Sequence, residues 1–456
     1  MIKIFNHYFH KRTLLQIWFD LSLLMLAVLS MVLSNAGDPT SAYPSFLATF
    51  FFLATGLLLL SAAFGFYRRG SNRSIAQAAS RSLLVWLLML PLIYSVAHRM
   101  QQPRTFGLTL ALMVLLLLVL RVYAMHAKKS AMLRQRVLVF GIGERAKMVG
   151  AALKHADPYV DLVGYYAGPN ESDARVTAWG LLSMTNSLTD IVMEEQVDVI
   201  VVALSERRGG AMPMRELLDC KLQGVRVMDI ATHFERTLGQ IRLESVSAGW
   251  LIFGDGFGSG WVRSIVKRAF DIVCSAVLLL LTLPVMLVTA ILIVLESGFP
   301  VLYFQERVGL NGRLFNVVKF RSMRSDAEKD GQPRWASAKD DRVTKIGRVI
   351  RKLRIDELPQ LFSVLGGTMS LVGPRPERPF FVDKLTEQIP YYAVRHSVKP
   401  GVTGWAQIRY QYGASVEDSA EKLQYDLYYV KNHSLFLDIL ILFETVGVVL
   451  MRKGAQ

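Results

Sequence analysis

The chain has 456 residues, a length that predicts two or three domains, and 52% of its residues are hydrophobic. Its formal net charge of +15 is typical of proteins that bind either nucleic acids or anionic lipids and phosphates. The basic residues lie beside long apolar runs and not along an aromatic-rich groove, so no nucleic-acid partner is expected. The two cysteines, Cys220 and Cys274, are far apart, which argues against a disulfide framework and a cysteine metal site.

Four apolar runs predict a transmembrane domain over residues 1–127. A helix needs roughly 20 apolar residues to span a membrane, and the third run is short and contains Pro91. Basic residues precede the first run, separate the second from the third and follow the fourth, so both ends of the four-helix bundle should lie in the cytoplasm. Because the runs carry almost no charge, we interpret the bundle as an anchor. The runs are residues 14–34, 46–66, 82–97 and 106–125.

Residues 128–255 alternate between predicted strands and helices, which is typical of a Rossmann-like, doubly wound α/β domain. The strand at 136–140 precedes GIGERA at 141–146, which matches the G-x-G-x-x-A fingerprint of dinucleotide-binding domains. The acidic residue expected about 20 residues further on is missing, since that region reads VGYYAGPN. Two interpretations stay open: a nucleotide site, or glycines that only allow close packing in a regulatory or dimerising domain, which we favour. Further strands are predicted at 162–167, 197–203 and 225–230.

An apolar run at residues 269–296 is long enough to cross a membrane as a fifth transmembrane helix. Pro284, near its middle, removes a backbone hydrogen bond and predicts a kink. Basic residues lie on both flanks, which favours a segment that enters and leaves the membrane on one face. We therefore predict a re-entrant helix over about residues 266–297. The flanking cations are Arg263, Lys267 and Arg268 before the run and Arg307, Arg313, Lys319 and Arg321 after it.

The segment after this run contains two predicted strands and two predicted helices. Asn311-Gly312 indicates a tight turn between strands at 301–304 and 314–320. Residues 343–353 are expected to form an amphipathic helix whose cations can lie along anionic headgroups. Residues 435–451 should form a helix that is buried or lies on a surface, because two acidic residues interrupt its apolar run.

Asp356 and Glu357 are adjacent carboxylates in a cation-rich stretch, residues 351–376. Asp before an apolar helical pattern is a common N-cap and Glu suits a first helical turn, so helix capping is one interpretation. Arg354 lies two residues before Asp356, and Arg375 belongs to a stiff Gly-Pro-Arg-Pro turn. Carboxylates can hold Mg²⁺ or attack phosphorus, and Arg binds phosphates in a bidentate manner. A phosphate-handling site is therefore the other interpretation, and we favour it.

Several motifs from Arg268 to about Lys453 resemble, in the same order, the bacterial sugar transferase family, which are phosphoglycosyl transferases with a re-entrant membrane helix. The apolar spans and the α/β domain resemble the larger members, which initiate exopolysaccharide, colanic acid or O-antigen synthesis. One departure is Leu283, since the family often has Ser before the proline of the helix break. The matching motifs are KRAFDIV, the apolar run with a central Pro, YFQERVG, KFRSM, LRIDELPQL, MSLVGPRP, KPGVTGWAQI and YDLYYVK.

The resemblance implies a two-step reaction in a catalytic domain over residues 256–456. Asp356 would attack the β-phosphate of a UDP-sugar, with UDP-glucose as the expected donor, and UMP would leave. Undecaprenyl phosphate would then take the phosphosugar from the aspartyl intermediate. Mg²⁺ would lie on Asp356 and the diphosphate, Glu357 would position or deprotonate the incoming group, and Pro284 would set the depth of the re-entrant helix. The residues expected to bind substrate phosphate are Arg375, Lys319, Arg354 and Arg321.

The resemblance also implies a location and partners. We expect a multi-pass protein of the bacterial inner membrane, surrounded by membrane lipid, with its catalytic domain on the cytoplasmic face. A homodimer through the spans or the middle domain is a further expectation. The alternative from another class is a catalytically inactive membrane sensor or scaffold whose α/β domain binds a nucleotide. The intact Asp356, Glu357, Arg375 and Lys319 argue against this alternative.

Overall fold

A computed structural model of the chain divides into two compact units, which are described separately. One unit is His10–Leu238, and the other combines Ile2–Phe9 with Gly239–Gln456. The predicted boundaries at residues 127 and 255 stay predictions. The described residues are 2–4, 7–9, 11–35, 39–67, 75–98, 107–108, 111–112, 114–116, 118–119, 122, 135–156, 160–169, 171, 175–176, 180–182, 187–204, 212–246, 248–253, 256–258, 260–324, 342–410 and 415–450.

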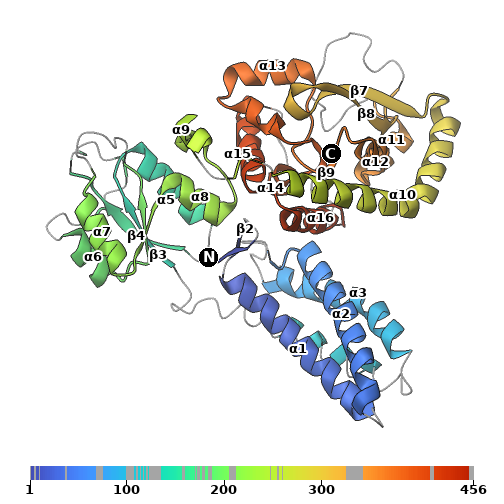
Figure 1. Ribbon diagram of the computed structural model, residues 1–456, viewed down its shortest axis with the longest axis horizontal. Helices are drawn as coiled ribbons and strands as arrows, with labels where there is room; N and C mark the ends of the chain where they lie inside the picture. Colours follow the sequence, from blue (N-terminus) through green and yellow to red (C-terminus); the bar gives the residue numbers. More distant parts are fainter. Residues whose placement is uncertain are drawn as a thin grey trace. The chain divides into compact units, whose positions relative to one another are not determined.

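Three of the four leading apolar runs form long helices in the first unit (Figure 1). These helices are α1 (Lys11–Asn35), α2 (Pro39–Ala63) and α3 (Ile75–Ala97), and α3 contains Pro91 without ending there. Half of the fourth predicted run, residues 106–125, lies outside the described residues.

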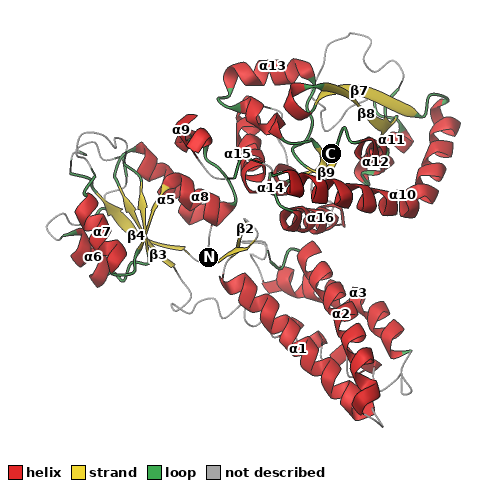
Figure 2. Ribbon diagram, in the orientation of Figure 1, coloured by secondary structure: helices red, strands yellow, loops and turns green. Residues whose placement is uncertain are grey.

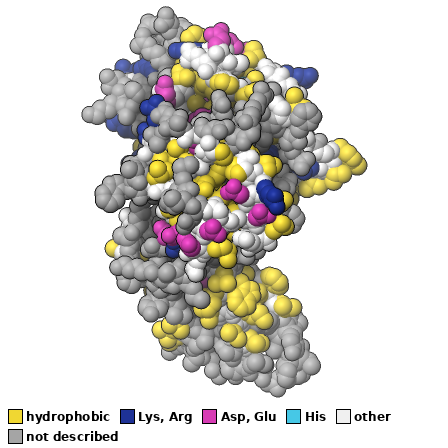
Figure 3. All heavy atoms as spheres, turned by 90° about the vertical axis from the view of Figure 1, so that its left-hand side faces the viewer, with side chains coloured by type: hydrophobic (Ala, Val, Ile, Leu, Met, Phe, Trp, Pro, Cys, Tyr) yellow, Lys and Arg dark blue, Asp and Glu magenta, His cyan; other side chains and the backbone are white. Residues whose placement is uncertain are grey.

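These helices are apolar on their outer surfaces as well as in their shared core. Leu24, Leu57 and Met89 are among the buried side chains that hold α1, α2 and α3 together. Apolar side chains also gather on the lower part of the surface in Figure 3, where Figure 1 has these helices. A helix that is apolar all round is typical of a buried or membrane environment. By length and composition, Ala76–Val96 and Trp261–Ser297 are the described helices able to cross a membrane.

The rest of the first unit is a parallel sheet with helices on both faces (Figure 2). Its elements are β3 (Gln135–Phe140), α5 (Glu144–Ala156), β4 (Val160–Tyr166), α6 (Leu188–Glu194), β5 (Val199–Val202), α7 (Met214–Leu222), β6 (Arg226–Asp229) and α8 (Ile230–Leu238). The strand order is β4-β3-β5-β6, and each neighbouring pair is parallel. Val137 and Val139 belong to one buried cluster, and Leu138 and Phe140 belong to another. Successive strand residues therefore fill two cores, which confirms the predicted doubly wound α/β arrangement.

The long apolar run of the second unit forms a single helix, α10 (Trp261–Ser297), with Pro284 inside it. The chain stays helical through Pro284, so there are not two separate helices, but Figure 1 shows the first and second halves of α10 running in different directions. Many of its apolar side chains are exposed, among them Leu280 at 74% and Leu295 at 77%. The bend is the result that a central proline predicts.

Both halves of α10 are held by polar contacts to the same unit. In the first half, Asp271 accepts a hydrogen bond from the backbone N–H of Leu371 at 3.2 Å. Lys267 forms an ion pair of 2.7 Å with Asp438, whose side chain is fully buried. At the other end, the Glu296 carboxylate accepts the backbone N–H of Lys345 at 2.7 Å. The two ends of the helix are therefore anchored to one folded body.

The remainder of the second unit combines a hairpin, a short parallel strand pair and several helices. Its elements are β7 (Leu302–Val308), β8 (Leu314–Phe320), α11 (Lys345–Lys352), the 3-10 turn η6 (Ile355–Glu357), α12 (Gln360–Gly366), β9 (Ser370–Val372), α13 (Pro379–Gln388), the 3-10 turn η7 (Tyr392–Ser397), β10 (Gly401–Thr403), α14 (Trp405–Arg409), α15 (Val416–Asn432) and α16 (Leu435–Leu450). Strands β7 and β8 are antiparallel, and Asn311 and Gly312 have φ values of 53° and 77° at their turn. This geometry confirms the predicted turn.

A short hairpin from the start of the chain belongs to this same unit. It consists of β1 (Ile2–Ile4) and β2 (His7–Phe9), which pair in antiparallel fashion. The His7 ring is buried, lies edge-on to Trp405 and has its Nδ1 2.8 Å from the hydroxyl of Tyr428. Burial, followed by the charge of Arg409, lowers the pKa of His7 to about 3, so this ring is neutral at physiological pH. The sequence alone identifies this segment only as a basic flank of the first apolar run.

Candidate active site

A residue with a left-handed backbone conformation precedes Asp356 and Glu357, whose side chains lie in the interior of the second unit. Arg354 has φ 59° at the end of α11, and the chain then forms the turn η6 that contains both carboxylates. Both side chains are buried, with Asp356 9% and Glu357 8% exposed. Neither caps a helix, because α12 begins after Pro359 and its first turn has no side-chain cap. The capping interpretation of this pair is therefore wrong.

Glu357 is the shared anion of three cations from three parts of the chain. Its Oε1 accepts hydrogen bonds from Arg375 Nη2 at 2.8 Å and from Lys319 Nζ at 3.3 Å. Its Oε2 lies 3.6 Å from Arg354 Nη1. Burial opposes ionisation, but these three cations together hold the pKa of Glu357 well below its usual range. Because so weak a base is a poor proton acceptor, the arrangement favours a positioning role for Glu357 over deprotonation of a substrate.

Asp356 is in a different electrostatic state from its neighbour. Burial, followed by the charge of Glu357, raises the pKa of Asp356 to about 6. Its Oδ1 is buried and has no hydrogen-bond partner among the described residues. A buried carboxylate oxygen without a partner is costly, and such groups are characteristic of functional sites. Asp356 is thus the carboxylate of this pair that is available to react or to bind a metal ion.

The predicted phosphate-binding residues fall into two groups. Lys319, Arg354 and Arg375 meet at Glu357, as expected for one site. Arg321 is elsewhere: its Nη2 donates to the carbonyl oxygens of Ser297 and Gly298 and to the Ser297 hydroxyl, at the carboxyl end of α10. Helix carboxyl ends attract cations because their last carbonyls lack partners. Arg321 thus closes the end of α10 through its Nη2, apart from the cluster at Glu357, and its binding of substrate phosphate stays a prediction.

The residues present fit a magnesium ion that arrives together with a substrate. The described residues contain no group of three or more His, Cys, Asp or Glu side chains able to hold a metal by themselves. Mg²⁺ is commonly bound by one or two carboxylates plus substrate phosphates, with several retained waters. The unpartnered Oδ1 of Asp356 supplies one such ligand. Asp356 would hold the ion, which would neutralise phosphate charge.

In the α/β domain, the carboxylate of Glu171 binds backbone N–H groups at the glycine-rich turn. Glu171 Oε2 accepts the backbone N–H of Ile142 at 2.8 Å and that of Gly168 at 3.3 Å. In dinucleotide-binding domains, backbone N–H groups of this turn face the pyrophosphate. Here one of them already binds an anion, Glu171, which follows β4 in a loop and was not singled out from the sequence. This contact favours packing over nucleotide binding as the role of GIGERA.

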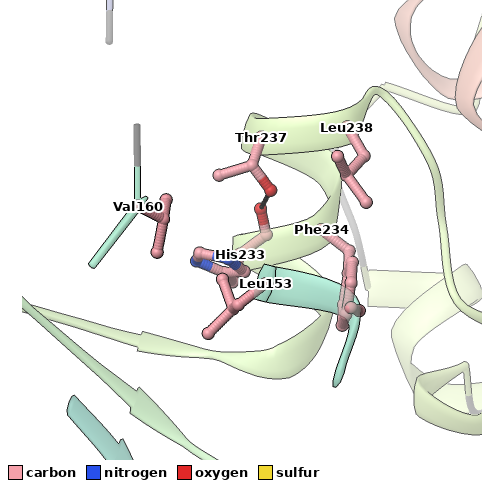
Figure 4. Close-up of a pocket in the computed structure, with 7 residues that line it drawn as sticks. Leu153, Val160, His233, Phe234, Thr237 and Leu238 are labelled. Atoms are coloured by element: carbon pink, nitrogen blue, oxygen red, sulfur yellow. Dashed lines mark hydrogen bonds between the residues drawn. The ribbon is translucent and has the colours of Figure 1, made fainter. Parts of the chain in front are cut away.

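A small cavity in the same domain offers no alternative ligand site (Figure 4). Its volume of about 10 Å³ is close to that of a single water. Within it the Thr237 hydroxyl donates to the His233 carbonyl oxygen at 2.6 Å, as Figure 4 shows. The lining residues are Ala152, Leu153, Val160, His233, Phe234, Thr237 and Leu238.

Three arginines that bind backbone carbonyls around the site were not predicted as site residues. Arg268 donates to the carbonyl oxygens of Val364 and Leu365, both at 2.6 Å, and so closes α12. Arg307 and Arg395 donate to backbone carbonyls of the turn that contains Arg375. Arg268 and Arg307 were recognised only as cations flanking the apolar run. No local pattern distinguishes an arginine that binds backbone carbonyls from a solvated one, because its partners are distant in the sequence.

Comparison with known proteins gives a consistent set of relatives. The family described as "Bacterial sugar transferase" matches residues 262–452. The UDP-N-acetylgalactosamine-undecaprenyl-phosphate N-acetylgalactosaminephosphotransferase of Aeromonas hydrophila is 44% identical over 242 residues, which are 53% of this chain and 56% of that protein. The UDP-glucose:undecaprenyl-phosphate glucose-1-phosphate transferase of Xanthomonas campestris pv. campestris is 31% identical over 350 residues, 74% of this chain and 71% of that protein.

A third relative has another sugar in its name. The undecaprenyl-phosphate galactose phosphotransferase of Salmonella typhimurium is 30% identical over 360 residues, which are 72% of this chain and 70% of that protein. The chain thus spans about half the length of the Aeromonas relative and about seven tenths of the other two.

The position of Arg321 leads to a stability prediction. Arg321→Met should lower the free energy of unfolding by about 1–3 kcal/mol, because the carbonyl oxygens at the end of α10 lose a charged donor whose side chain is buried. Chemical unfolding in detergent micelles, together with hydrogen exchange of the last turn of α10, would measure this loss. Arg348→Met is the matched control, since Arg348 is exposed on the neighbouring α11. Equal stability of the Arg321 and Arg348 variants would contradict the assignment.

Proposed function

The chain belongs to the bacterial sugar transferase family, and on that basis we propose that it transfers a sugar phosphate from a UDP-sugar to undecaprenyl phosphate. The observation that carries the proposal is Asp356, a buried carboxylate with a raised pKa and an unpartnered oxygen beside three cations. The names of the relatives share undecaprenyl phosphate but differ in the sugar, which is N-acetylgalactosamine, glucose or galactose. UDP-glucose is the donor that we propose first.

Asp356 acts as the nucleophile in the first of two steps. One of its carboxylate oxygens forms a bond to the β-phosphorus of the UDP-sugar, the bond from that phosphorus to the bridging oxygen breaks, and UMP leaves with the electron pair. A phosphate oxygen of undecaprenyl phosphate then attacks the same phosphorus and releases the Asp356 carboxylate. The products are UMP and undecaprenyl-diphospho-sugar. This would be the first membrane step of exopolysaccharide or O-antigen synthesis.

The cations around Glu357 supply the positive charge that the reaction needs. Arg375, Lys319 and Arg354 share the single buried carboxylate of Glu357, which leaves an excess of positive charge for a diphosphate. Phosphoryl transfer depends mostly on alignment and on charge neutralisation. Glu357 keeps the three cations at fixed positions before substrate binds, so little reorganisation is needed. A bound Mg²⁺ would add further neutralisation of the phosphate oxygens.

The anchoring of α10 supports a re-entrant arrangement that brings the site to the lipid headgroups. A straight helix of this length would extend about 55 Å, well beyond the roughly 30 Å of the hydrocarbon core. Instead, Asp271 near one end and Glu296 near the other bind backbone N–H groups of one folded unit. A single crossing would separate these contacts across the membrane. We propose that α10 dips into the cytoplasmic leaflet, so that the acceptor lipid reacts without leaving the bilayer.

The first unit has a supporting role in this proposal. The leading apolar helices anchor the enzyme in the bacterial inner membrane, and the α/β domain regulates or dimerises it. The Glu171 contact at the glycine turn supports this role over a nucleotide sensor. The inactive-scaffold alternative is disfavoured by the intact Asp356, Glu357, Lys319 and Arg375 arrangement.

UMP release from a panel of UDP-sugars tests the proposed reaction. Repeated turnover, measured as UMP released from one of the donors, should occur only when both undecaprenyl phosphate and Mg²⁺ are present. Asp356→Asn should reduce turnover by at least about a thousandfold while the protein stays folded, because an amide cannot form the covalent intermediate. Glu357→Gln should slow the reaction without abolishing it. Normal turnover by Asp356→Asn, or no release from any UDP-sugar, would refute the mechanism.

The raised pKa of Asp356 predicts an acidic limb in the pH profile. The nucleophile must be ionised, so kcat/KM should be full at neutral pH and fall as the pH decreases through about 6. Glu357→Gln removes the neighbouring negative charge and releases Arg375 and Lys319, which lowers the pKa of Asp356. The acidic limb should therefore move to lower pH in this variant. An unchanged limb would contradict the electrostatic coupling of the pair.

Cysteine labelling tests the topology of α10. In a background without Cys220 and Cys274, single cysteines at Ser264 and Phe299 should both react with a membrane-impermeant reagent from the cytoplasmic side. Both positions are exposed and flank the apolar run. A cysteine between the first two apolar runs is the control, and it should react from the periplasmic side. Periplasmic labelling of the Phe299→Cys variant would show a full crossing.

A further inference from the structure

The turn that contains Arg375 has an unusual density of backbone hydrogen bonds. Four successive carbonyl oxygens in this turn accept a donor from another element, and the two prolines leave few backbone N–H groups to hold it otherwise. Two donors are backbone N–H groups and two are guanidinium groups. The pairs are Gly401 N to Pro374 O at 3.0 Å, Arg395 Nη2 to Arg375 O at 2.9 Å, Arg307 Nη1 to Pro376 O at 3.1 Å, and Val308 N to Glu377 O at 3.0 Å.

Arg395 is the most deeply buried of these guanidinium donors. It lies in η7, its side chain is 6% exposed, and its Nη2 is 2.8 Å from Asp426 Oδ2 on α15. Its Nε donates to the same oxygen at 3.1 Å, and its Nη1 donates to the Tyr392 hydroxyl at 2.8 Å. The Asp426 side chain is only 3% exposed. The planar fork of the guanidinium is thus fixed on all sides before it meets the Arg375 carbonyl.

Stability alone does not explain a pair placed in this way. Removing two charges from water costs free energy that the pair's attraction often does not recover. What the burial does provide is a fixed orientation of the Arg395 guanidinium, which donates to the backbone carbonyl of Arg375. The side chain of that same residue binds Glu357 Oε1 at 2.8 Å. A continuous chain of contacts therefore connects Asp426 through Arg395 and Arg375 to the carboxylate pair.

We propose that Arg395, held by Asp426, is a positioning residue that sets the guanidinium of Arg375 for phosphate binding. This inference rests on the proposed transfer reaction, in which Arg375 binds substrate phosphate. Arg395 acts through the backbone of the turn, since its own donors are used by Asp426, Tyr392 and the Arg375 carbonyl. A displacement of about 1 Å at a positioned group can reduce a rate about a hundredfold.

A double-mutant cycle between Arg395 and Arg375 tests this role in the full-length protein. Arg395→Lys keeps the positive charge beside Asp426 but cannot donate in a fork, so it should reduce kcat/KM about 10- to 100-fold. In an Arg375→Lys background the same change should cost less than about threefold, because the residue that it positions is already altered. Losses that multiply in the double variant, or wild-type activity of Arg395→Lys, would overturn the proposal.

A matched control and a second measurement separate positioning from folding and from the reaction itself. Arg242→Lys alters another arginine paired with α15, at Glu421, and should retain kcat/KM within about threefold. An equal loss in this control would make the effect of Arg395 merely structural and would overturn the proposal. The same double-mutant cycle is then measured with the binding affinity for UDP in place of kcat/KM. Binding of UDP can be measured without turnover. Absence of UMP release from the wild type would refute the proposed function, whereas multiplying losses of UDP affinity would refute the positioning role.

Discussion

The second unit depends on one buried anion, the carboxylate of Glu357. Lys319 comes from a strand of the hairpin, Arg354 from the end of a helix and Arg375 from a rigid turn, and all three contact this side chain. Without Glu357, three positive charges would face one another at a partly buried site with no anion between them, which is unfavourable. Their convergence on one carboxylate joins three elements and leaves a net positive site. The same contact sets the fold locally and prepares the surroundings for a diphosphate.

The two adjacent carboxyl groups of Asp356 and Glu357 thus have pKa values shifted in opposite directions. The cations hold Glu357 ionised and fully engaged, whereas burial and the neighbouring charge raise the pKa of Asp356. Environments that separate the pKa values of paired carboxylates are a general way to assign different roles to them. Asp356 keeps an oxygen without a partner, which a nucleophile needs. The 3-10 turn accomplishes this by directing one side chain toward the cations and leaving the other beside them.

The long apolar helix α10 is integrated into the same body by charged groups at both ends. Lys267 and Asp271 fasten its first half, and Arg321 and Glu296 fasten its last turn. Polar groups are used where the helix meets the folded unit, and apolar side chains cover the middle. Pro284 lies between these two regions and accounts for the bend. Because both ends of α10 are fixed to one folded unit, the bend of this helix and the position of the carboxylate pair are mechanically connected.

The sequence determined the features that depend on local pattern. Apolar periodicity and strand–helix alternation gave the parallel sheet, Asn311-Gly312 gave the hairpin, and the adjacency of Asp356 and Glu357 to cations indicated the site. The tertiary structure alone decided which partner each charged side chain has. Lys319 and Arg321 are two residues apart, yet one meets Glu357 and the other closes α10, because Lys319 lies within β8 whereas Arg321 lies beyond its last residue, Phe320. Arg395 likewise acquires its role only through Asp426 and Arg375, which folding brings to it from distant positions.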